Sequence, residues 1–132
     1  MKLIPLVALL LSGCSIFGNL QVAHFDSGEY DRITKVRLLA IQTAGQCQNP
    51  ASVKALSEQL NTATVELAVY SQGLPSNSDT SKILGQFHNL TSELYKRYDA
   101  VGSVSEAYCV DKLAIITDSA TTIQRTIGSK PK

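Results

Sequence analysis

The pattern that most constrains this fold is a three-and-four spacing of apolar residues, which returns in four successive segments of the chain. It is cleanest between Val104 and Ile127, where the apolar stripe consists of Cys109, Leu113, Ile116, Ala120, Ile123 and Ile127. Two β-branched clusters in this segment, at residues 115–117 and 121–123, are typical of strands. The spacing is nevertheless helical rather than alternating, and no turn residue interrupts it. The pattern therefore predicts a helix.

Capping residues mark the ends of the other three predicted helices. Asp26, with Glu29 three residues later, opens a helix from about Ser27 to Ala44, and Asn49-Pro50 opens one that runs to about Gln72. A third helix is expected from about Thr80 to Ala100, and a Ser103–Glu106 capping box is expected before the fourth. The predicted stripe of the first helix consists of Tyr30, Ile33, Val36, Arg37, Ala40, Ala44 and Cys47. That of the second consists of Val53, Leu56, Leu60, Ala63, Leu67, Tyr70 and Leu74, and that of the third of Ile83, Phe87, Leu90, Leu94, Tyr98 and Val101.

Short connections between four helices predict antiparallel neighbours. We therefore expect an all-α protein, an up-down-up-down four-helix bundle over residues 26–128 with a tail at 129–132. A chain of 132 residues suits a single domain of this kind.

The start of the chain carries a separate signal. Lys2 is followed by an apolar run from Leu3 to Leu11 and then by Ser12-Gly13-Cys14. The run is shorter than the ~20 residues that span a bilayer. These residues resemble the signal peptide and lipobox of bacterial lipoprotein precursors, in which an aliphatic residue and two small residues precede an invariant cysteine.

The lipoprotein resemblance implies how the chain is processed and where in the cell it is located. Residues 1–13 would be the cleaved signal peptide, and Cys14 would carry the lipid anchor, with palmitate among its acyl chains. Ser15, rather than aspartate, implies transfer to the outer membrane, on its periplasmic face. Residues 14–25 would form the tether, although Ile16, Phe17 and Leu20 leave open that this segment lies against lipid or against the domain.

Export also bears on the redox state of the two remaining cysteines. Cys47 and Cys109 form an even pair in a chain sent to an oxidising compartment, which predicts a disulfide. The up-down topology places both at the same end of adjacent helices, so two lines of reasoning agree. The alternative is a pair of buried free thiols.

Composition excludes several classes of function. Removal of Lys2 with the leader leaves 11 basic and 11 acidic residues in no blocks, so there is no electrostatic case for nucleic acid. The only imidazoles are His24, expected in the tether, and His88, expected beside an apolar stripe. We expect no metal, no cofactor and no enzymatic activity, because no nucleophile motif or phosphate-binding loop is present.

Two surface features remain. Asp26, Glu29 and Asp31 cluster at a helix N-terminus, where carboxylates complement the helix dipole more often than they bind a cation. Tyr95, Tyr98 and Tyr108 are expected near one end of the bundle, as a partner surface or, more simply, as half-buried side chains.

These features favour a non-enzymatic envelope lipoprotein that binds another protein in the periplasm or has a structural role there. The alternatives are a phage- or prophage-encoded lipoprotein that blocks a receptor or an invading phage, and a carrier of a small apolar ligand in the bundle. The sequence leaves the partner and the oligomeric state open.

Overall fold

The structure, a computed structural model, describes residues 22–132 and confirms the four-helix bundle. The helices are α1 (Ser27–Ala44), α2 (Pro50–Gln72), α3 (Ser78–Val101) and α4 (Glu106–Gly128). The predicted signal peptide, Cys14, Ser15 and most of the tether lie outside the described residues. Within residues 22–132, no helix is long and apolar enough to cross a bilayer.

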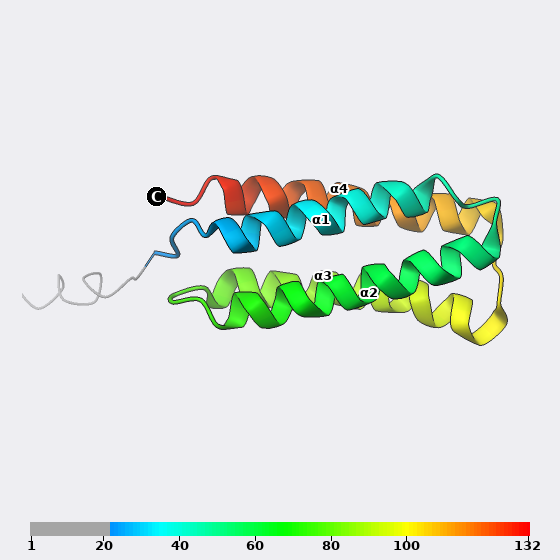
Figure 1. Cartoon of the computed structure of the whole chain (residues 1–132), viewed down its shortest axis with the longest axis horizontal. Helices are drawn as coiled ribbons and strands as arrows, with labels where there is room; N and C mark the ends of the chain where they lie inside the picture. Colours follow the sequence, from blue (N-terminus) through cyan, green and yellow to red (C-terminus); the bar gives the residue numbers. More distant parts are fainter. Residues whose placement is uncertain (1–21) are drawn as a thin grey trace, which may run out of the picture.

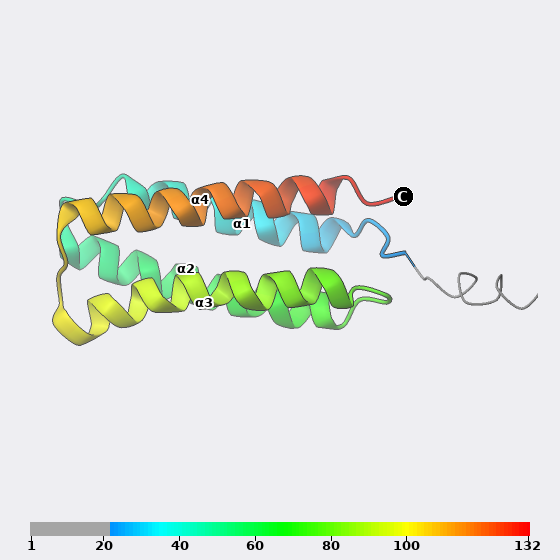
Figure 2. The same ribbon diagram turned by 180° about the vertical axis from the view of Figure 1, so that it is seen from behind.

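The bundle is built from two helix pairs. Figures 1 and 2 show α1 beside α4 and α2 beside α3, and α1 also packs on α2. The closest packing joins α2 with α3, whereas α3 and α4 touch least. Both ends of the described chain lie beside the α2–α3 loop, at what we call the terminal end (Figure 1). The other two connections form the opposite end, which we call the disulfide end.

The buried stripe of α4 matches the predicted one at every position. The stripe of α3 does not, because Ile83 and Val101 are 45% and 59% exposed. Since α3 packs mainly on α2, its buried face is turned toward that helix. The buried residues of α3 are therefore Thr80, Leu84, Phe87, Thr91, Leu94 and Tyr98.

The other two stripes also include small polar residues in place of predicted apolar ones. In α2, Leu56 and Tyr70 are only half-buried, as is Leu74 just beyond the end of the helix. Ser57, Thr64 and Ser71 are buried instead, because their small side chains fit where the helices approach closely. In α1 the half-buried residues are Tyr30, Arg37 and Ala44, and the buried stripe continues through Glu29 and Thr43.

Side-chain caps fix where three helices begin. The Asp26 carboxylate accepts the Glu29 N–H at 2.8 Å, and the Asn49 side chain accepts the Ser52 N–H. The expected Ser103–Glu106 capping box is wrong. The N-cap of α4 is Ser105, whose backbone is extended and whose hydroxyl accepts the Tyr108 N–H at 3.2 Å, so the helix begins at Glu106.

The disulfide prediction is confirmed. Cys47 and Cys109 are bonded, with their Cα atoms 5.7 Å apart, within the limit of about 7 Å for a disulfide. Cys47 follows the end of α1 and Cys109 lies in the first turns of α4. The bond therefore ties the α1–α4 pair together at the disulfide end.

Candidate functional site

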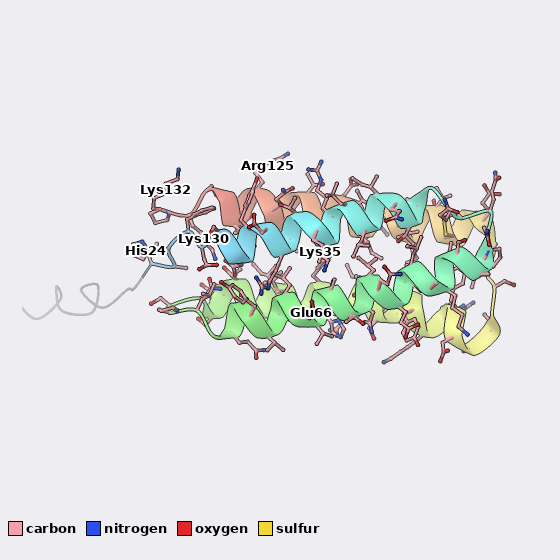
Figure 3. The ribbon with its side chains drawn as sticks, viewed as in Figure 1. His24, Lys35, Glu66, Arg125, Lys130 and Lys132 are labelled. Carbon is pink, nitrogen blue, oxygen red and sulfur yellow. A yellow bond between two sulfur atoms is a disulfide. The ribbon has the colours of Figure 1, made fainter. Side chains whose placement is uncertain are left out.

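The most elaborate polar arrangement lies inside the terminal end. The Glu29 carboxylate, from the first turn of α1, is completely buried, and Lys130 from the C-terminal tail is 8% exposed. Their Nζ and Oε2 atoms are 2.6 Å apart. A buried charge is tolerated only when it is paired and hydrogen-bonded, so this contact holds the tail onto α1. In Figure 3, Lys130 lies beside the start of α1.

Asn77 and Ser71 form further hydrogen bonds with this ion pair. The Asn77 amide nitrogen donates to Glu29 Oε1 at 2.7 Å, and the Ser71 hydroxyl donates to the same oxygen at 2.8 Å. The Asn77 oxygen accepts from Lys130 Nζ at 2.7 Å. Glu29, Ser71, Asn77 and Lys130, which we call the end network, thus join α1, α2, the α2–α3 loop and the tail.

Further contacts surround the first turn of α1. Tyr70 donates its hydroxyl to the Asp26 carboxylate at 2.9 Å, and the Arg32 guanidinium lies 3.9 Å from the centre of the Tyr70 ring. A Cβ on Gly28 would clash with the Tyr70 hydroxyl, so any other residue here would force this ring to shift. The Glu29 N–H, followed by the Tyr70 hydroxyl, lowers the pKa of Asp26, and the bond to Asp26 raises the pKa of Tyr70.

The predicted acidic cluster at the start of α1 is therefore divided between different roles. Asp26 caps the helix, Glu29 belongs to the buried network, and Asp31 is exposed. No three His, Cys, Asp or Glu side chains of the described part of the chain are grouped so as to hold a metal ion.

The three tyrosines expected near one end differ in burial. Tyr98 is 1% exposed and belongs to the core, so its place on a partner surface is wrong; burial raises its pKa. It lies on the α3 stripe, where helix packing buries it. Tyr95 and Tyr108 are half-buried, and the Arg97 guanidinium lies 5.5 Å from the Tyr108 ring centre.

The two histidines also differ. His24 is exposed near the tail, as Figure 3 shows. His88 is half-buried between α2 and α3, where its Nδ1 shares a hydrogen bond of 3.0 Å with the Thr64 hydroxyl. Thr64 also pairs with Thr91 at 2.7 Å. Burial lowers the pKa of His88, with a smaller contribution from Lys96.

Shallow grooves mark the surface of the described residues. One of them, of about 540 Å³, lies where α3 and α4 diverge and is lined by Ile83, Phe87, Leu90 and Ile123 together with polar residues. Another, of about 290 Å³, lies between α1 and α4 and includes Ile41, Val110, Ala114 and Thr117. A third, of about 340 Å³, lies between α1 and α2 beneath Lys35 and Glu66.

Sequence reasoning missed the end network, although one signal was present. Glu29 lies four residues before Ile33 and so continues the buried stripe of α1. The capping-box pattern gave Glu29 a surface role instead. Lys130 lies in the predicted tail, where sequence alone gives no reason to expect burial.

Comparison with models of protein families, with curated proteins and with solved structures finds no match to this chain.

Proposed function

We propose that the chain is a small envelope lipoprotein, anchored through Cys14 to the periplasmic face of the outer membrane, with a non-enzymatic binding or structural role. The observation that carries the proposal is the Cys47–Cys109 disulfide in the folded domain. Structural disulfides form in oxidising compartments such as the periplasm. The disulfide and the lipobox resemblance are independent signs of export.

The arrangement of the bundle indicates how the domain would be oriented relative to the membrane. The tether enters at the terminal end, so that end faces the membrane and the disulfide end points away from it (Figure 1). Because α3 is 24 residues long, the disulfide end of an upright bundle lies about 36 Å further from the membrane than the terminal end does. The half-buried Tyr95 and Tyr108 are placed there, where a periplasmic protein partner has access.

Lipidation is tested by Cys14→Ser in cells supplied with labelled palmitate. We expect the wild-type chain to take up the label and to fractionate with membranes, and the variant to remain unlabelled and to be uncut or soluble. Ser15→Asp is the matched variant for sorting, because it leaves the anchor in place and should move the protein to the inner membrane. Label in the Cys14→Ser variant, or wild-type protein among inner-membrane markers, would contradict the proposal.

Partner binding is tested separately, by placing a photoreactive residue at Tyr108 in whole cells. We expect one reproducible protein adduct from Tyr108 and none from the same residue at Gln72, an exposed position at the terminal end. Equal adducts from both positions would contradict a partner surface at the disulfide end.

The α3–α4 groove supports a second candidate, the carrier of a small apolar ligand. Its volume falls within the range of ligand pockets, and its base consists of Phe87 and Ile123, which are 3% and 7% exposed. An apolar fluorescent probe should bind the wild-type protein, and Ile83→Lys should abolish that binding. Unchanged binding in the variant would exclude this groove.

A further inference from the structure

The outer face of the α1–α4 pair is an apolar surface that the fold leaves uncovered. Leu38, Ile41 and Val110 are 61%, 47% and 47% exposed. Ile41 and Val110 border the groove between the two helices, and Leu38 lies one turn from Ile41 on α1. We call Leu38, Ile41, Val110, Ala114 and Thr117 the α1–α4 face.

The two helices of this face are fixed to each other by a covalent bond and by side-chain hydrogen bonds. The disulfide fixes one end of it, and Gln124 of α4 bonds both Thr34 at 2.8 Å and Arg37 at 3.1 Å. A surface that is already rigid loses little conformational entropy on binding. At its centre the Thr117 hydroxyl is buried without a hydrogen-bond partner among residues 22–132.

The same contacts define which residues of α1 and α4 lie at one height along the bundle. Thr34 and Arg37 lie level with Gln124, and Cys47 with Cys109. Continuing this antiparallel register, Leu38 lies level with Thr121, and Asp31 lies within one turn of Arg125. Asp31 and Arg125 are both exposed.

We infer that a second copy of this chain covers the α1–α4 face, in a parallel dimer. Copies anchored in one membrane point the same way, and this step rests on the proposed function. A two-fold axis along the bundle then sets α1 of one copy against α4 of the other at the same height. Leu38 and Ile41 meet Thr117 and Thr121 of the other copy, and Asp31 meets Arg125, so the contact between the copies is complementary in charge.

The size of the face indicates a weak dimer. The 18 residues of α1 span about 27 Å, and two packed helices are about 20 Å wide, so the pair buries about 1,000 Å² in total. That area is at the lower limit for a specific interface. Anchoring in a membrane favours such a dimer by raising the effective concentration of the two copies.

The test uses the full chain in membranes, with two differently tagged copies that each carry one added cysteine. Leu38→Cys in one copy and Thr121→Cys in the other should form a crosslinked heterodimer with a short bismaleimide, severalfold above a control pair. The control replaces Leu38→Cys by Val69→Cys on α2, since Val69 has the same exposure of 61%. Equal yields from the two pairs would overturn the inference.

Two further measurements keep the test sharp. Asp31→Arg alone should reduce the yield, and adding Arg125→Asp to the same chain should restore it; no recovery would contradict the Asp31–Arg125 contact. A Leu38→Cys homodimer as strong as the heterodimer would mean that α1 faces α1, which excludes the parallel arrangement. Protein found in the soluble fraction would contradict the anchor, whereas membrane-bound protein without the heterodimer would contradict only the dimer.

Discussion

Glu29 has the least typical environment of any charged residue in the described chain, because its side chain is completely buried. Two neutral donors, Ser71 and Asn77, and one cation, Lys130, satisfy its two oxygens, and each comes from a different part of the chain. Such a group is destabilising once a single partner is lost, since its charge stays buried. The stabilising effect of the end network therefore depends on each of its residues singly.

Lys130→Met should lower the free energy of unfolding by about 3–5 kcal/mol, because Glu29 would keep its burial and lose its counter-ion. Lys132→Met is the matched control: Lys132 is exposed two residues further on, and its loss should cost within about 0.5 kcal/mol. Denaturant unfolding of the two variants measures the difference. Equal stabilities would show that the Glu29–Lys130 contact contributes nothing net.

His88 should make stability depend on pH. Burial lowers the pKa of His88 in the folded chain below 6.5, the ordinary value that applies in the unfolded chain. Between the folded pKa and 6.5 the unfolded chain therefore binds more protons than the folded chain, and the free energy of unfolding rises as pH rises through this range. On acidification from about pH 7.5 to pH 5, the wild-type melting temperature should fall more than that of His88→Gln. His24→Gln, at an exposed position, should leave the wild-type slope unchanged. A parallel pair of slopes for wild type and His88→Gln would contradict this prediction.

At the scale of the helices, the N-cap of α4 can be tested directly. Ser105→Ala should cost about 1 kcal/mol, because the Tyr108 N–H would lose the side-chain oxygen that accepts it. Ser103→Ala is the control, since Ser103 lies before the helix. Thermal unfolding of the two variants decides between Ser105 and the predicted capping box, and a larger effect at Ser103 would restore the latter.

Helix number, most helix bounds and the α4 stripe were predictable, because spacing and capping residues are local properties of the sequence. The start of α4 was not, because Ser105 rather than Ser103 caps that helix. The rotation of α3 was not, because it depends on how closely α3 approaches α2 rather than α4. Thr64 and Thr91 form a buried hydrogen bond at that contact, and apolar spacing alone cannot predict such a pair. The end network was unpredictable for the same reason, since it unites residues up to 101 positions apart.

At the scale of the whole molecule, the bundle is held together differently at its two ends. A covalent bond joins α1 to α4 at the disulfide end, and the end network joins the tail to three other segments at the terminal end. The Phe25 N–H also donates to the Pro131 carbonyl at 2.8 Å, so the tether enters beside the C-terminal tail. Force applied through the tether would therefore act on the end network before it reached the core.

The contribution of the disulfide can be measured with Cys47→Ala/Cys109→Ala. The two cysteines are 62 residues apart, and in the chain-entropy model closure of such a loop stabilises the folded state by about 4 kcal/mol. We expect the variant to keep its helical content, because the side chains around the bond still pack, and to melt several degrees lower. Chemical reduction of the wild-type protein is the independent comparison and should produce the same shift. If neither treatment changes the melting temperature, the disulfide is dispensable for the domain, and the α1–α4 pair is held by Gln124 and the apolar stripe alone.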